Sequence, residues 1–133
     1  MKTFISLSAL FLSLSLTAQT NPAYWYLNDM SGNGFQSSIL NTASGNLSLA
    51  TGFSTTASGS LSTAMGFGTT ASDTASLVVG QYNLAGETVT SSDTEFSLDN
   101  TAFVIGNGID SDNQSDALVV KFNGDTTLAG SMN

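Results

Sequence analysis

The feature that most constrains this chain is a line of 14 residues that is written three times in succession, over residues 42–83. Every seventh position of these lines is a glycine, except for one aspartate; the positions are Gly45, Gly52, Gly59, Gly66, Asp73 and Gly80. A fixed short period is typical of solenoids, in which each repeat is one unit that stacks on the next. The repeat therefore predicts a stack of similar coils.

Each coil has room for two short strands and two tight turns, but not for a pair of helices. Serine, threonine and glycine dominate the repeats, and they are poor residues for helix interiors. We expect the repeat glycines to supply positive φ in the turns, and Asp73 to replace one because aspartate tolerates the left-handed region. A flexible linker would not keep leucine and alanine in phase. The predicted fold class is all-β, a parallel β-roll or solenoid with 14-residue coils.

The alternation of side chains within each coil predicts which face is inside. Before Gly52, Gly66 and Gly80 stand the stretches SLAT, STAM and SLVV, and strand side chains alternate between two faces. One face carries small residues that suit a narrow interior: Ser48, Ala50, Ser62, Ala64, Ser76 and Val78. The other carries the larger set: Leu49, Thr51, Thr63, Met65, Leu77 and Val79. An exposed apolar stripe indicates an interface, and we expect its partner to be another copy of the chain.

These stretches, each followed by a TAS or NLA step, resemble the SVAIG-type repeats in the heads of trimeric autotransporter adhesins. The resemblance covers residues 42–83. The head of that family is a YadA-like left-handed parallel β-roll that assembles as a homotrimer, and the resemblance implies both properties here. It also implies that the six larger residues pack around the threefold axis. Thr51 and Thr63 depart from the family pattern, which prefers aliphatic residues at these positions.

The segments around the repeats predict the domain organisation. Residues 1–19 combine a basic start, an apolar stretch and a small residue before the expected cleavage site, which indicates a secretory signal peptide. The alternative is a buried N-terminal helix. Residues 20–41 hold a YWY cluster, and we expect them to cap the first coil, as solenoids require; a sugar-binding aromatic platform is the alternative. The repeats fill residues 42–83, and an irregular coil followed by a divergent C-terminal β unit fills residues 84–133.

The divergent C-terminal unit shows two local signals. The stretch AFVIGNG, residues 102–108, repeats the theme of an apolar run that ends in glycine. The stretch DALVVKFNGDTTLAG, residues 116–130, predicts a strand, a turn at Asn123-Gly124 and a returning strand, because Asn-Gly between strands is a strong hairpin signal.

Charge and composition exclude several classes of function. The formal net charge is −8, and after removal of the signal peptide Lys121 is the one basic residue against ten acids. Nucleic acids and anionic membrane surfaces are therefore unsuitable partners, and no segment predicts insertion into a membrane. The chain has no cysteine and no histidine, which excludes disulfides, Ser-His or Cys-His nucleophiles and His/Cys zinc sites. A small domain without disulfides suggests stabilisation by oligomerisation.

Four acids crowd one loop after the repeats: Glu87, Asp93, Glu95 and Asp99. Paired carboxylates carry out glycoside hydrolysis, but acid-rich loops are common, and we expect no enzymatic activity and no cofactor.

A second acidic stretch, IDSDNQSD, places oxygen ligands at Asp110, Asp112, Asn113 and Asp116. Calcium prefers such ligands, but the stretch lacks the glycine and the closing glutamate of an EF-hand. We expect a solvated turn without a metal.

The combined expectation is a secreted or cell-surface trimeric adhesin head, held at the outer membrane if an anchor lies downstream. It would attach to an extracellular protein or glycan surface by multivalent binding. One alternative is a structural segment of an extracellular or phage-like fibre. Another is an ice-binding solenoid, because Thr55-Thr56 and Thr69-Thr70 recur once per coil. Adjacent threonines point to opposite faces of a strand, which counts against a threonine ladder.

Overall fold

The structure is a computed structural model that describes residues 26–28 and 34–131. The predicted signal peptide and most of the predicted N-terminal cap, including Tyr24 and Trp25, lie outside these residues. The described residues form eleven strands and no helix, which confirms the all-β class. The strands are β1 (Tyr26–Asn28), β2 (Gly34–Gln36), β3 (Thr42–Ala43), β4 (Leu49–Phe53), β5 (Thr56–Ala57), β6 (Thr63–Phe67), β7 (Thr70–Ala71), β8 (Leu77–Gln81), β9 (Thr101–Asn107), β10 (Asp116–Lys121) and β11 (Thr126–Leu128).

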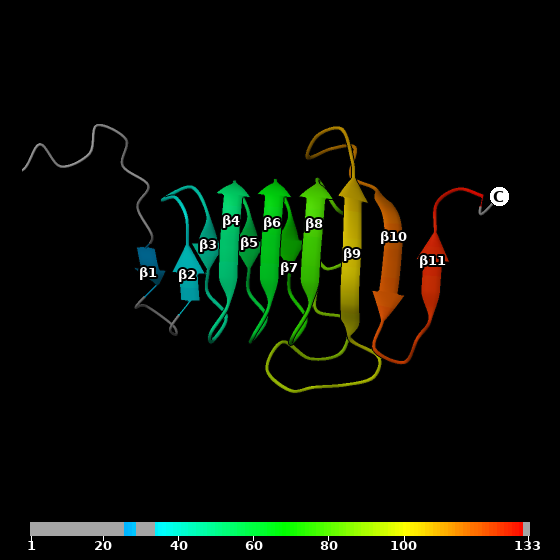
Figure 1. Ribbon diagram of the computed structural model, residues 1–133, viewed down its shortest axis with the longest axis horizontal. Helices are drawn as coiled ribbons and strands as arrows, with labels where there is room; N and C mark the ends of the chain where they lie inside the picture. Colours follow the sequence, from blue (N-terminus) through cyan, green and yellow to red (C-terminus); the bar gives the residue numbers. More distant parts are fainter. Residues whose placement is uncertain (1–25, 29–33, 132–133) are drawn as a thin grey trace, which may run out of the picture.

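The strands form two sheets that face each other (Figure 1). The large sheet has eight strands in the order β1-β2-β4-β6-β8-β9-β10-β11, and the small sheet has three in the order β3-β5-β7. The five strands from β2 to β9 are parallel, whereas β1, β10 and β11 each pair antiparallel with their neighbours.

Each coil of the repeat contributes one long strand to the large sheet and one short strand to the small sheet. Leu49 pairs with Thr63 and Thr63 with Leu77, so the register advances by 14 residues per coil. On the small sheet, Thr56 pairs in the same way with Thr70. The predicted parallel solenoid of 14-residue coils is confirmed.

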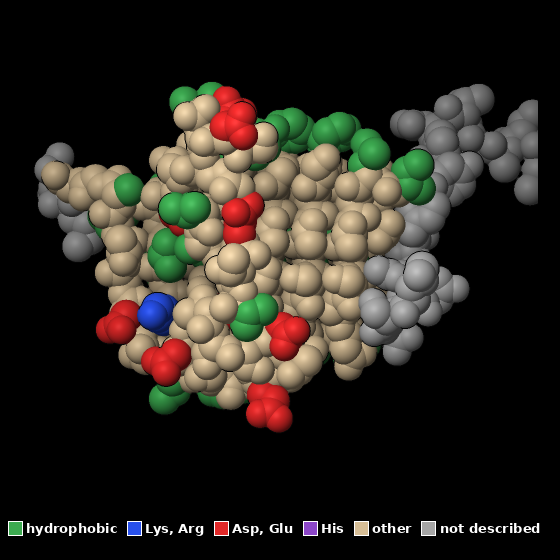
Figure 2. All heavy atoms as spheres, turned by 180° about the vertical axis from the view of Figure 1, so that it is seen from behind, with side chains coloured by type: hydrophobic (Ala, Val, Ile, Leu, Met, Phe, Trp, Pro, Cys, Tyr) green, Lys and Arg blue, Asp and Glu red, His purple; other side chains and the backbone are tan. Residues whose placement is uncertain are grey.

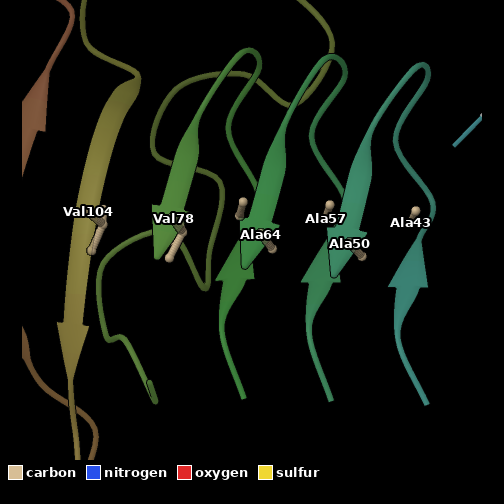
Figure 3. Packing of buried hydrophobic residues seen from close by; sticks show 7 residues of the cluster. Ala43, Ala50, Ala57, Ala64, Val78 and Val104 are labelled. Atoms are coloured by element: carbon tan, nitrogen blue, oxygen red, sulfur yellow. The ribbon is translucent and has the colours of Figure 1, made fainter. Parts of the chain in front are cut away.

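Among the described residues, the fully buried apolar side chains between the sheets are all alanine or valine. They are Ala43, Ala50, Ala57, Ala64, Ala71, Val78 and Val104, and Figure 3 shows their side chains directed into the space between the strands. Ser48, Ser62 and Ser76 are also at most 1 % exposed. The small face predicted from the alternation is therefore the interior, because two sheets so close together leave no room for larger side chains.

A second row of buried polar residues runs through the interior at the same 14-residue spacing. It consists of Asn41, Thr55, Thr69 and Asn83, all at most 2 % exposed. The asparagines at the two ends are bonded to the backbone: the Asn41 side chain accepts the N–H of Thr55 at 3.0 Å, and the Asn83 side chain accepts that of Thr70 at 2.8 Å. The Thr55 and Thr69 hydroxyls between them have no hydrogen-bond partner.

The expected role of the repeat glycines is only partly correct. Gly52, Gly66 and Gly80 do have positive φ, of 127°, 125° and 103°, but they lie inside the long strands and not in turns. A side chain on Gly66 would overlap the backbone carbonyl of Gly80 in the next coil. These glycines are required both by their φ and by the close approach of stacked backbones.

The expectation of positive φ at Gly45, Gly59 and Asp73 is wrong. In each of these three turns, positive φ occurs two residues later in the chain. The residues that adopt it are Leu47, Leu61 and Ala75, with φ of 54°, 58° and 61°. A side chain on Gly59 would overlap the carbonyl of Asp73 in the next coil. Glycine is needed there because of contact with the next coil.

Asp73 stands in the last regular coil, and its carboxylate binds the segment that follows the repeats. One oxygen accepts the N–H of Thr90 and the other that of Thr101, both at 2.6 Å, and the side chain is fully buried. We name residues 84–100, which separate the last repeat from β9, the excursion. At its start the Asp116 carboxylate accepts the N–H groups of Leu84 at 3.0 Å and Ala85 at 2.6 Å.

The C-terminal unit continues the large sheet. β9 pairs parallel with β8, and Gly80 lies opposite Gly106, so β9 is the long strand of a fourth, enlarged coil. β10 and β11 form the hairpin predicted at Asn123-Gly124, with Gly124 at a φ of 93°.

Candidate interaction surfaces

The six residues predicted to form an interface lie on the outer face of the large sheet. Met65 and Leu77 are exposed, at 42 % and 37 %, and the other four are partly exposed. The strand register aligns them in two rows that run across the coils. The structure therefore places all six on one surface, directed away from the core.

This apolar surface extends beyond the repeats, to which the predicted interface was confined. One row, in strand register, consists of Phe35, Leu49, Thr63, Leu77, Phe103 and Val120. The parallel row consists of Thr51, Met65, Val79, Ile105, Leu118 and Leu128. We name these two rows the outer face. The apolar runs at residues 102–105 and 117–120 were the signal that this face continues.

A row of aromatic rings stands at the carboxyl ends of the long strands. The rings of Phe53 and Phe67 stack with centroids 5.3 Å apart, and the ring of Tyr82 meets that of Phe67 edge-on at 5.0 Å. Phe53 is 50 % exposed and Phe67 40 %. The 14-residue spacing of Phe53 and Phe67 could have predicted this row. One ring face of each phenylalanine is covered by the other ring. The row is therefore an apolar edge of the large sheet and not a flat platform on which a ligand could stack.

The outward face of the small sheet is polar (Figure 2). Thr42, Thr56 and Thr70 are paired across the strands, and each precedes a buried alanine. The serines after these alanines return to the outward side, where the hydroxyls of Ser58 and Ser72 lie 3.1 Å apart. The outward hydroxyls therefore come from a Thr-Ala-Ser pattern, whereas Thr55 and Thr69 are fully buried. The adjacent threonines thus point to opposite faces, as expected.

The acidic stretch at residues 110–116 does not gather its oxygens around one point. Asp110 Oδ1 accepts the N–H groups of Asp112 and Asn113 and the side-chain amide of Asn113, at 2.8–3.0 Å. The hydrogen bond from the Asn113 side chain, followed by that from the Asp112 backbone, lowers the pKa of Asp110. Asp116 is engaged by Leu84 and Ala85.

The four acids of the excursion, Glu87, Asp93, Glu95 and Asp99, are all exposed. Across the residues described, no group of three or more acidic side chains is placed to hold a metal ion. The same part of the chain contains no helix long and apolar enough to cross a membrane.

Comparison of the chain with models of known protein families, with curated proteins and with solved structures finds no match. The class of protein that the fold defines is a parallel β-solenoid with an apolar outer face.

Proposed function

We propose that the chain is a secreted or surface-displayed homotrimeric adhesin head, built from left-handed β-roll coils, that attaches to an extracellular surface by multivalent binding. The observation that carries the proposal is the outer face, two rows of mainly apolar side chains on a sheet whose other side is already fully packed. Contiguous apolar surface of this kind is typical of association sites. The repeat resemblance supports a trimer as the form of association.

The narrow core explains why association would stabilise this chain. The core residues are alanines and valines, which bury little apolar area each. The larger apolar residues are outside, so a single chain leaves its greatest hydrophobic contribution unused. Packing three copies through their outer faces would bury Met65, Leu77 and Val79 together and supply the stability that disulfides supply in other small secreted domains.

A trimer would also display each remaining surface three times. Weak contacts of single copies then add through effective concentration, which can raise avidity by about 10² or more. The role is one of binding, without catalysis. Beads that carry the secreted chain should adhere to extracellular-matrix or cell surfaces, and beads that carry Met65→Asp chains, which cannot form the trimer, at equal density should not. Equal adhesion by both would contradict the multivalent mechanism.

A structural segment of an extracellular fibre is the alternative that shares the same trimer. It would show the same particle mass but no adhesion of the coated beads to any surface tested.

A second candidate is ice binding, favoured by the Thr-Ala-Ser pattern of the small sheet. The pattern arranges hydroxyls at about 4.8 Å between strands and about 6.7 Å along each strand. The array is short, since it covers β3, β5 and β7 only, and Ser72 donates to the Glu87 carbonyl at 3.0 Å. Inhibition of ice recrystallisation that is lost in Thr56→Lys would establish this function, and its absence would exclude it.

A further inference from the structure

The second half of the excursion, residues 92–100, is a closed loop folded around one buried side chain. Asn100 is fully buried; its Oδ1 accepts the N–H of Ser92 at 2.9 Å, and its Nδ2 donates to the carbonyls of Ser92 and Glu95 at 3.1 and 3.2 Å. The Ser92 hydroxyl in turn accepts the N–H of Glu95 at 2.8 Å. The backbone of the loop is therefore fixed by polar groups, without burial of large apolar side chains.

The loop is also attached to both parts of the molecule beside it. Ser60 in the repeats donates its N–H to the carbonyl of Asp93 at 2.7 Å. Asn123, in the turn of the C-terminal hairpin, donates its N–H to the carbonyl of Leu98 at 2.9 Å. Loops that are held rigidly by a scaffold are frequent carriers of binding residues.

Two large apolar side chains of this loop point into solvent. Phe96 is 62 % exposed and Leu98 58 %. The Phe96 ring meets the ring of Phe122 edge-on, with centroids 5.0 Å apart, so a contact with the hairpin fixes its position. We name Phe96, Leu98 and Phe122 the Phe96 patch. Its exposure on a fixed backbone indicates a contact site for an apolar group.

Exposed carboxylates border this patch in the sequence. Asp93, Glu95 and Asp99 are exposed on the same loop, and Lys121 is the single basic residue of the part described. Figure 2 shows acidic side chains spread over the lower part of the molecule, with apolar side chains between them. The whole chain carries a formal net charge of −8, so its field attracts cations and repels anions.

We propose that the Phe96 patch binds a basic polypeptide segment in which lysines or arginines flank an apolar side chain. The apolar side chain packs on Phe96 and Leu98, and the flanking cations lie against the carboxylates of Glu95 and Asp99. The proposal rests on the proposed adhesin function and names the class of its ligand. The patch lies on the excursion and the adjoining hairpin turn, whereas the proposed trimer contact is on the outer face, so either proposal can be contradicted without the other.

The probe is a fluorescent synthetic peptide with lysines on both sides of a central phenylalanine, titrated with the secreted chain at physiological salt and followed by anisotropy. We expect saturable binding that is at least about tenfold weaker for a peptide with serine in place of phenylalanine. The double variant Phe96→Ser/Leu98→Ser should weaken binding by a similar factor. Glu95→Gln/Asp99→Asn should also weaken it and should flatten its dependence on salt.

The matched control is Ile109→Ser, which removes a 78 % exposed apolar side chain beyond the far end of β9 and should bind as the unchanged protein does. The proposal is overturned if no peptide binds saturably. It is also overturned if the unchanged protein binds the serine peptide as tightly as the phenylalanine peptide, or if Phe96→Ser/Leu98→Ser binds the phenylalanine peptide as tightly as the unchanged protein does. It is also overturned if the double variant changes the particle mass in light scattering, because the patch is then a contact between copies. Normal peptide binding by a monomeric wild type would contradict only the trimer.

Discussion

The carboxylate of Asp73 accepts the backbone N–H of Thr101 at 2.6 Å, and these residues are 28 apart in the sequence. Asp73 occupies a position that is glycine in the two preceding coils, where a side chain would overlap the next coil. After the last regular coil, the excursion lies where the next coil would stack. A carboxylate at residue 73 can therefore bind two backbone N–H groups. The break in the repeat is therefore the point at which the solenoid joins its C-terminal unit.

Substitution of Asp73 tests this junction. Asp73→Asn keeps one acceptor oxygen but turns an amino group toward the other backbone N–H, so the free energy of unfolding should fall by about 1–3 kcal/mol. Asp73→Gly restores the repeat pattern yet removes both bonds, and it should destabilise at least as much. Urea denaturation at equal chain concentration measures both. Asp112→Asn, an exposed control, should change stability by less than about 0.5 kcal/mol; a stabilised Asp73→Gly would contradict the role of the carboxylate.

Alanine at Gly66 and at Gly124 separates backbone strain from backbone contact. Both glycines have positive φ, but a side chain on Gly66 would overlap the Gly80 carbonyl, whereas Gly124 has open space around it. Gly124→Ala should cost about 1–2 kcal/mol, and Gly66→Ala should prevent folding or cost several kcal/mol more. Thermal melting compares the two, and similar melting temperatures would show that the stacked coils can separate to admit a side chain.

The buried hydroxyls of the interior predict opposite effects for two conservative substitutions. Thr69→Val removes a fully buried hydroxyl that has no partner, so stability should stay the same or rise by up to about 1 kcal/mol. Ser76→Ala removes a hydroxyl that donates to the Asp73 carbonyl at 2.8 Å, and it should lower stability by about 1 kcal/mol. Chemical denaturation of both variants checks the sign, and marked destabilisation by Thr69→Val would mean that its hydroxyl is satisfied in solution.

The turn at Asp110 should not bind calcium tightly. A calcium ion would have to displace three hydrogen bonds to Asp110 Oδ1, and Asp116 is already bound to the start of the excursion. Calorimetry with calcium should show no binding at micromolar concentration. Micromolar affinity that is lost in Asp112→Ala would reveal a site that this geometry does not provide.

The period of the sequence predicted the coil length, the two strands per coil and the interior residues of the long strands, because a 14-residue repeat and a two-residue alternation are direct consequences of strand stacking. It could not predict positive φ at Leu47 and Leu61, since leucine gives no sign of a left-handed backbone. It also missed the bonds of Asp73, which join the last regular coil to the excursion and to β9, and those of Asn100, which close the loop within the excursion, because neither set follows the repeat. The aromatic row could have been found, because Phe53 and Phe67 follow the repeat.

The central claim is that three copies pack through the outer face, and Met65 is its most direct probe. Met65→Asp would place three carboxylates together in a desolvated contact, where unpaired charges are strongly unfavourable. The freed chains, with their apolar rows exposed, should unfold or aggregate. Ser62→Leu, by contrast, overfills the interior at about 1–3 kcal/mol and should damage the fold of each chain.

The decisive measurement is the light-scattering mass of the purified secreted chain and of Met65→Asp, with Asn46→Asp as an exposed control outside the outer face. The account predicts three times the chain mass for the wild type and for Asn46→Asp, and loss of that particle for Met65→Asp. A wild type that is a folded monomer, or a Met65→Asp variant that remains an unperturbed trimer, would contradict it.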